Sequence, residues 1–169
     1  QDVLIHLYSF SKVFRLPGHR VGALVAGKDR LAEIEKFLDT MTICPNQLGQ
    51  RAALFGLQSL GDWVAEERAE ILRRREAVAQ ASATLDGWRL LGLGAYFAYL
   101  EHPWDPPSDE IARRLVSEAG VLLLPGTMFA PRAAQGGDGS AEKQLRVAFA
   151  NVDAAGISTL SERLRTFRP

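Results

Sequence analysis

The sequence predicts a soluble α/β protein, and three observations lead to this expectation. Of its 169 residues, 47% are hydrophobic and 24% are charged, which is the composition of an ordinary globular domain. Short apolar runs typical of strands alternate with segments whose apolar residues recur every three to four positions, as in amphipathic helices. A chain of this length can bury roughly two thirds of its unfolded surface, so its core requires neither a disulfide nor a metal.

Charge and hydropathy argue against several other classes of protein. Lys+Arg and Asp+Glu each number 20, so no basic excess points to a nucleic-acid partner. The densest basic run, Arg73-Arg74-Arg75, follows Glu70 at helical spacing, which favours paired surface charges over a phosphate-binding patch. No stretch approaches the roughly 20 apolar residues of a membrane span, and the first residues lack the basic region of a signal peptide. We therefore expect no nucleic acid, no membrane and a cytoplasmic location.

The first half of the chain is expected to hold two strands and three helices. Residues 2–8 form an apolar run typical of a buried strand, and Asp29 is a suitable N-cap for a helix that follows. The expected elements are strands over residues 2–8 and 21–26, a loop over 9–20, and helices over 29–41, about 47–60 and roughly 63–84. The last helix has apolar residues seven positions apart on one face, a pattern found in helices that brace two lobes.

The second half is expected to alternate short strands with two more helices. Ser108 is expected to cap the clearer helix, and Gly120 is the glycine expected to end it. The expected elements are strands over residues 88–93, 96–100, 121–124 and 144–150, helices from Ser108 and from about Asp153, and a mobile loop over 130–142. That loop has too few apolar residues to pack.

The segment 9–22 carries the side chains best suited to chemistry. Lys12 follows the first expected strand, and apolar neighbours there would partly desolvate its amine and favour the neutral, nucleophilic form. Ser9, Ser11 and Arg20 supply hydroxyl and guanidinium donors that suit a phosphate dianion. On spacing alone, an ordinary solvated lysine is the more common alternative.

This segment resembles the pyridoxal 5′-phosphate attachment region of the class I and II aminotransferases, the fold-type I group. The resemblance is carried by Ser9-Phe10-Ser11-Lys12 and by Leu16-Pro17-Gly18-His19-Arg20-Val21-Gly22. It implies that Lys12 forms the internal aldimine with pyridoxal 5′-phosphate (PLP), and that Ser9, Ser11 and Arg20 bind the cofactor phosphate.

Later segments resemble the same family in type and order. They are Cys44-Pro45-Asn46-Gln47, Gly94-Ala95-Tyr96-Phe97, Val121 to Phe129 with its Pro125-Gly126, and Leu145 to Ala150. Ala130 departs from the pattern, because glycine is common at that position. The resemblance implies that Arg146 binds the substrate α-carboxylate, with which a guanidinium can form a bidentate ion pair. Without the family, Arg146 would be expected to pair with an acidic neighbour such as Glu142.

The resemblance also implies a reaction and an incomplete enzyme. The family moves an amino group between an amino acid and a 2-oxo acid and acts as a homodimer. Its aspartate for the pyridine nitrogen, its ring-stacking aromatic and its glycine-rich phosphate loop precede the lysine strand, but only eleven residues precede Lys12. We therefore expect residues 1–62 to be the C-terminal remnant of the large PLP-binding domain, residues 63–169 to be the small α/β domain, and the chain to be a fragment inactive alone.

Two other functions stay open, and no metal is expected. The lysine loop would look alike in a PLP-dependent lyase or decarboxylase of the same fold, since only substrate contacts differ. A different class is the aminotransferase-like effector-binding domain of a transcriptional regulator. No pair of histidines has the spacing of metal ligands, and Cys44 has no partner cysteine.

Overall fold

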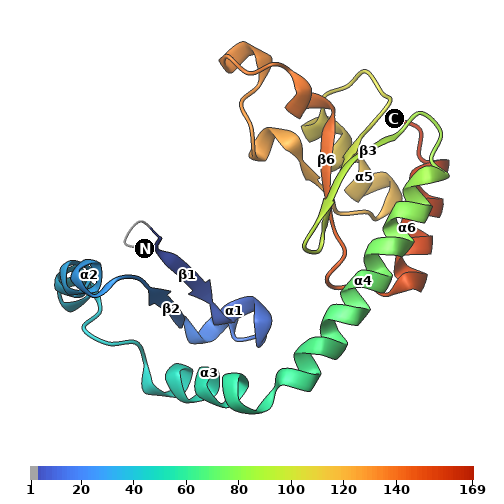
Figure 1. Cartoon of the computed structure of the whole chain (residues 1–169). Coiled ribbons are helices and arrows are strands. Elements are labelled where there is room, and N and C mark those ends of the chain that lie inside the picture. The colour runs from blue at the N-terminus through green and yellow to red at the C-terminus, as the bar shows by residue number, and fades with distance from the viewer. Residues whose placement is uncertain (1–3) are drawn as a thin grey trace. The chain divides into compact units, whose positions relative to one another are not determined.

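The computed structural model describes residues 4–169 (Figure 1). The chain forms two compact units, residues 1–68 and 69–169, and the boundary falls within helix α4 (Gly61–Ala83). The expected division into domains after residue 62 stays a prediction. No helix in residues 4–169 is long and apolar enough to cross a lipid bilayer.

The first unit combines a two-stranded antiparallel ribbon with helices. Its elements are β1 (His6–Ser9), α1 (Phe10–Val13), a 3-10 turn (Pro17–His19), β2 (Gly22–Val25), α2 (Lys28–Met41) and α3 (Gln47–Ser59). The strands pair from His6 opposite Val25 to Ser9 opposite Gly22. The expected second strand and the expected helix over 47–60 are confirmed. The expected loop over 9–20 contains a helical turn and a 3-10 turn, and α2 is capped by Gly27 while Asp29 lies in its first turn.

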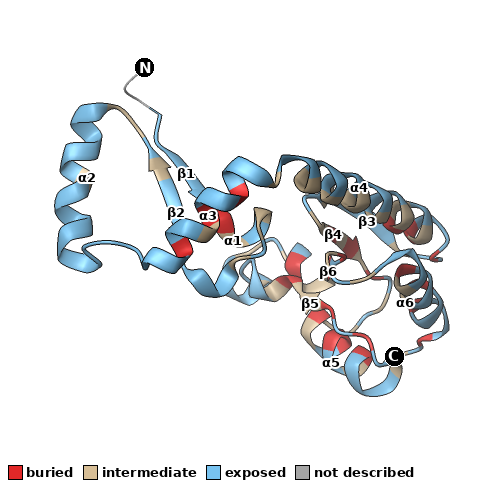
Figure 2. Cartoon of the chain, turned by 90° about the horizontal axis from the view of Figure 1, so that it is seen from below, coloured by how far each residue is buried: buried red, intermediate tan, exposed pale blue. Residues whose placement is uncertain are grey.

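The first strand is present as expected, but the expectation that it is buried is wrong. All four residues of β1 are exposed, and residues 2 and 3 of the expected strand lie outside the described residues. A two-stranded ribbon leaves both faces open unless another layer covers it. Within residues 4–68 the only buried hydrophobic side chains are those of Phe10, Val21 and Ala53, so α2 and both strands are largely exposed in Figure 2.

A small aromatic core fixes α1 against α3. The rings of Phe10 and Phe14 stack with their centroids 5.9 Å apart. A Cβ atom added at Gly56 of α3 would lie 2.6 Å from the Phe14 ring, so this close approach of helix and ring requires glycine. The short helix α1, and Lys12 with it, is thereby held to the longer α3.

The second unit is a four-stranded antiparallel sheet with helices on one face. Its remaining elements are β3 (Arg89–Gly94), β4 (Phe97–Glu101), α5 (Ser108–Ala119), β5 (Leu124–Pro125), β6 (Gln144–Ala148) and α6 (Ala154–Thr166), and its strand order is β3-β4-β6-β5. Alternate residues of β4 and β6 point into a core that they share with α4, α5 and α6. Its members include Val78, Ala98, Leu100, Ile111, Leu115, Leu145, Val147, Ile157 and Leu164. The residues between them on these strands, Arg146 among them, lie on the opposite face.

The basic run on α4 forms ion pairs, as expected. Arg73 and Arg74 each place a guanidinium nitrogen 2.7 Å from a Glu70 carboxylate oxygen. Hydrogen bonds from Arg74 and then Arg73 lower the pKa of Glu70. Arg74 also donates to the carbonyl of Ala150 at 2.6 Å, which attaches α4 to the segment before α6.

Two local expectations in the second unit are wrong. Pro107 is the N-cap of α5, and Ser108 is its first residue, fully buried, with its Oγ donating to the Ala141 carbonyl at 2.9 Å. The loop expected over 130–142 contains a 3-10 turn (Ala133–Gln135) and the start of a second (Ser140–Lys143), and Ala141 is fully buried. The mobility expected for this loop stays a prediction. The strand expected over 121–124 is limited to Leu124–Pro125.

Substitution Ser108→Ala is expected to destabilise the second unit. The variant loses the buried hydrogen bond to the Ala141 carbonyl, which keeps the one that it accepts from the Gln144 N–H, so the loss costs about 0.5–1.5 kcal/mol of unfolding free energy. Urea unfolding of the chain measures the change. Ser117→Ala is the matched control, because Ser117 lies on the same helix and makes longer, exposed bonds of 3.3 Å. Equal stability of the two variants would contradict the prediction.

Candidate active site

Lys12 lies on the one-turn helix that directly follows β1. Ser9 is both the last residue of β1 and the N-cap of α1, where its Oγ accepts a hydrogen bond from the Ser11 backbone N–H at 3.3 Å. Phe10 and Phe14 occupy the inner face of this turn, so Lys12, two positions after Phe10, is on the outer face. Its side chain is exposed, and the expected partial desolvation is wrong for the chain as described.

Arg20 is held in a strained backbone conformation beside the 3-10 turn. Its φ of 49° is in the left-handed region, which is uncommon for a residue with a side chain. Its Nη1 donates to the Pro17 carbonyl at 2.7 Å. Asn46 ties this turn to α3, because its Nδ2 donates to the His19 carbonyl at 2.6 Å and its Oδ1 accepts from the Gly49 N–H at 2.6 Å. The sequence placed Asn46 in a family-like segment but gave no sign of this bridging role.

The donor set of this loop fits a phosphorylated aldehyde. Ser9 and Ser11 supply hydroxyl groups, Lys12 supplies an amine, and Arg20 has N–H donors beyond the one that it uses internally. Within residues 4–169 neither Lys12 nor Arg20 forms an ion pair. The neighbouring Arg15 differs, since it pairs with Glu67 and stacks 5.4 Å from the Trp63 ring centroid. Two uncompensated cations beside two hydroxyls suit a dianionic phosphate.

Arg146 lies on β6 of the second unit, on the sheet face away from the helices. Its guanidinium carbon is 4.3 Å from the ring centroid of Phe97 and 4.1 Å from that of Phe129. Within the described residues its Nε is buried and has no hydrogen-bond partner. The expected alternative, an ion pair with Glu142, is absent from residues 4–169, where Glu142 instead lies 3.7 Å from Arg132.

The structure therefore places the candidate residues in two groups. Ser9, Ser11, Lys12 and Arg20 share the loop between β1 and β2 of the first unit, whereas Arg146 belongs to the second unit. In the part of the chain that the structure describes, no three His, Cys, Asp or Glu side chains gather as metal ligands do. The sequence did not predict that two aromatic rings would flank Arg146, although both rings lie in segments that it singled out.

The fold and these residues define an α/β chain with a lysine loop and an arginine-bearing antiparallel sheet, and comparison with known proteins identifies its family. The family model "Aminotransferase class I and II" matches residues 1–164. An aromatic aminotransferase of Arabidopsis thaliana is 28% identical over 97% of this chain and 40% of its own length. An L-glutamine–4-(methylsulfanyl)-2-oxobutanoate aminotransferase of Bacillus subtilis is 29% identical over 76% of this chain and 32% of its own length.

Solved structures agree with this assignment. An aminotransferase from Staphylococcus aureus matches 97% of this chain with a TM-score of 0.82 and 26% identity, and the match covers 41% of that protein. A methionine aminotransferase from Escherichia coli has a TM-score of 0.83 at 23% identity, which shows a shared fold, and 43% of its chain is covered. The chain belongs to the class I and II aminotransferases, a PLP-dependent family of fold type I. It spans about two fifths of the length of these solved structures.

Proposed function

We propose that the whole protein to which this chain belongs is an aminotransferase that moves an amino group between an amino acid and a 2-oxo acid. The observation that supports this most strongly is the loop of the first unit, where Lys12 and Arg20 lack ion pairs within residues 4–169 and two serines lie beside them. Family membership gives the loop its cofactor, PLP. The chain itself is proposed to be inactive alone, because it covers only part of its relatives.

The loop residues have separate tasks in this proposal. Ser9, Ser11 and Arg20 hold the cofactor phosphate, and Lys12 holds the aldehyde end through its Nζ atom. When bound, PLP provides an electron sink that stabilises charge developing at the substrate Cα. With the cofactor bound, Lys12 Nζ would remove the proton from that Cα and deliver it as general acid later in the reaction.

Arg146 is proposed to orient the substrate. Its guanidinium donates two parallel hydrogen bonds to the α-carboxylate, which fixes the orientation of the bound amino acid.

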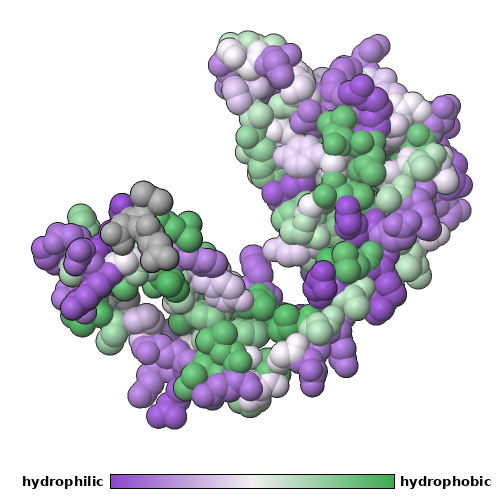
Figure 3. All heavy atoms as spheres, viewed as in Figure 1, coloured by the Kyte–Doolittle hydropathy of each residue, from purple (hydrophilic) through white to green (hydrophobic). Residues whose placement is uncertain are grey.

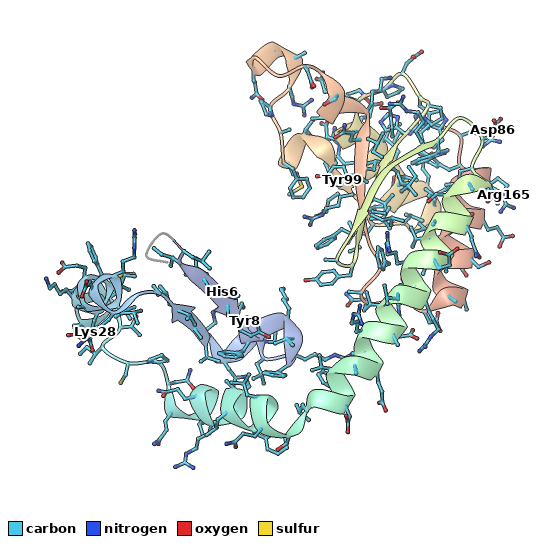
Figure 4. All side chains as sticks on the ribbon, in the orientation of Figure 1. His6, Tyr8, Lys28, Asp86, Tyr99 and Arg165 are labelled. Carbon is cyan, nitrogen blue, oxygen red and sulfur yellow. The ribbon has the colours of Figure 1, made fainter. Side chains whose placement is uncertain are left out.

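Substitution Arg146→Lys in the whole protein is expected to lower kcat/KM about 10²-fold. An ammonium group cannot reproduce the two parallel hydrogen bonds of a guanidinium, so transition-state binding weakens. The measurement is 2-oxo acid formation from a panel of amino acids with an added 2-oxo acid acceptor. Arg165→Lys is the control, because Arg165 is an exposed residue of α6 with no part in the proposal (Figure 4).

The same assay separates aminotransferase activity from that of other enzymes of this fold. Release of ammonia or carbon dioxide without amino transfer would indicate a lyase or a decarboxylase. Parent-like kcat/KM in the Arg146→Lys variant would remove Arg146 from the site. No turnover with any amino acid, together with ligand-dependent binding to DNA by the whole protein, would instead indicate an effector-binding domain.

The whole protein is further proposed to be a homodimer in the cytoplasm. Large apolar side chains are exposed on α2 and α3, where Figure 3 shows hydrophobic surface over α3, and both the rest of the polypeptide and a second copy are available to cover them. They include Phe37, Met41, Leu48 and Phe55, which are 59–79% exposed. Exposed apolar surface on this scale marks an interface with other protein. The exposed, unpaired thiol of Cys44 suits a reducing compartment.

A further inference from the structure

Two aromatic rings enclose the guanidinium of Arg146 from opposite segments of the second unit. Phe97 begins β4, directly after the turn at Ala95-Tyr96, and is offset from Arg146 by two positions in the β4–β6 register. Phe129 follows β5 and the 3-10 turn Gly126–Met128. The ring centroids lie 4.3 Å and 4.1 Å from the guanidinium carbon, well inside the range of a cation–π contact.

The position of Phe129 is fixed by backbone geometry. Pro125 pairs with Leu145 at the edge of the sheet, next to Arg146 on β6. A Cβ atom added at Gly126 would lie 2.6 Å from the Ala141 carbonyl oxygen, so only glycine allows the chain to turn so close to that backbone. The Phe129 N–H then donates to the Gly126 carbonyl at 2.8 Å and closes the turn.

Tyr99 supports this arrangement from β4. It lies directly opposite Arg146 in the strand register, and its ring meets the Phe129 ring edge to face, with centroids 6.3 Å apart. Figure 4 labels Tyr99 on the same sheet. Phe97 and Phe129 therefore flank one cation and Tyr99 supports Phe129, and we name these three rings the aromatic clamp.

We infer that the aromatic clamp is a specificity device: it positions the Arg146 guanidinium so that only the edge of its plane can receive a ligand, and it thereby selects planar carboxylates over tetrahedral oxyanions. This inference rests on the proposed function of Arg146. Rings stacked on a guanidinium leave its N–H donors free, because these donors point outward in the plane. A carboxylate lies in that plane and forms two parallel bonds. The third oxygen of a sulfonate projects out of the plane, toward a ring.

Binding of two matched anions to the whole protein tests this inference without reference to turnover. Propionate and ethanesulfonate each carry one negative charge on the same ethyl group, and differ in a planar or a tetrahedral head. The readout is the ¹⁵N-edited NMR signal of the Arg146 Nε–H, assigned by its loss in Arg146→Lys. We expect propionate to shift this signal with an affinity at least about tenfold higher than that of ethanesulfonate, since one bidentate pair distinguishes them.

Variants of the clamp separate its role from general stability. Phe129→Leu is expected to reduce the preference for propionate to less than about threefold, because one face of the guanidinium is opened. Phe129→Tyr keeps a ring on that face and should retain the parent preference. Phe167→Leu is the same change at a buried ring of the same unit that contacts Arg114 and not Arg146, so it should leave the preference unchanged. If Phe129→Leu kept both parent affinity and parent preference, the clamp would have no role in selection.

The two proposals fail in different ways. If propionate shifted no Arg146 signal in the parent protein, the proposed carboxylate site would be wrong and the clamp inference would be lost with it. If propionate bound but ethanesulfonate bound equally well, the carboxylate site would stand and the clamp inference alone would be overturned.

Discussion

Replacing Lys12 with alanine is expected to lower the kcat of amino transfer in the whole protein by at least about 10³-fold. The variant loses the amine that is proposed to act both as a nucleophile and as a base at the substrate Cα, and general acid–base groups contribute about 10²–10⁴-fold. Ser9, Ser11 and Arg20 are unchanged in this variant, so binding of the cofactor phosphate should persist. The loss should therefore fall mainly on kcat, with a smaller change in KM.

A chemical readout complements the kinetics of the Lys12 variant. Borohydride reduction in the presence of PLP should attach the cofactor to the peptide that contains Lys12 in the parent protein, and to no peptide of this loop in Lys12→Ala. Lys28→Ala is the matched control, because Lys28 is an exposed lysine at the start of α2 and should keep both label and turnover (Figure 4). Label on another lysine of the parent, or parent-like turnover of Lys12→Ala, would overturn the assignment.

Local signals in the sequence predicted the elements that local interactions determine. Helix α6 was predicted from Asp153, whose carboxylate accepts a hydrogen bond from the Gly156 N–H at 2.9 Å. The end of α5 was predicted from Gly120, which has a φ of 61° in the left-handed region. Both features depend on a few neighbouring residues, so one sequence is enough to see them.

Features that depend on distant segments were not predictable in this way. The apolar residues of β1 indicated a buried strand, but burial needs a covering layer that residues 4–68 do not provide. The loop over 130–142 is attached at Ala141 by a hydrogen bond from Ser108, which belongs to another element. The candidate site divides along the same line. Lys12, Ser9 and Arg20 lie in one continuous motif, whereas Phe97 and Phe129 reach Arg146 only through the pairing of three strands.

His102 affects the acid stability of the second unit, which its place in a proline-bounded loop of the sequence did not indicate. The second unit buries its side chain without hydrogen-bond partners. Its side chain is 2% exposed, and within the described residues neither ring nitrogen has a partner in hydrogen-bond geometry. The rings of Trp104 and Trp88 lie 5.8 Å and 6.5 Å from it. Burial first, and then the positive charge of Lys143, lowers the pKa of His102 from 6.5 to about 4.

This lowered pKa makes the second unit less stable in mild acid. Below pH 6.5 the imidazole takes up a proton in the unfolded chain, while in the folded chain it stays neutral until the pH nears 4. The unfolded state then binds more protons than the folded state. The contribution of His102 to the free energy of unfolding is therefore fully present above pH 6.5 and is lost as the pH falls toward 4. A difference of this size corresponds to about 3 kcal/mol of unfolding free energy, a large part of what a small domain has.

Substitution His102→Phe is expected to remove this part of the pH dependence. Acidic groups with lowered pKa, such as Glu70 and Asp109, also lose stability in acid, so the quantity to compare is the difference between parent and variant at each pH. Unfolding by urea should show a difference that grows in favour of His102→Phe by about 3 kcal/mol between pH 7 and pH 4, because phenylalanine has no proton to bind. His6→Phe, the same change at an exposed position, should give a flat difference. A flat difference for His102→Phe as well would mean that His102 does not control the acid stability of the second unit.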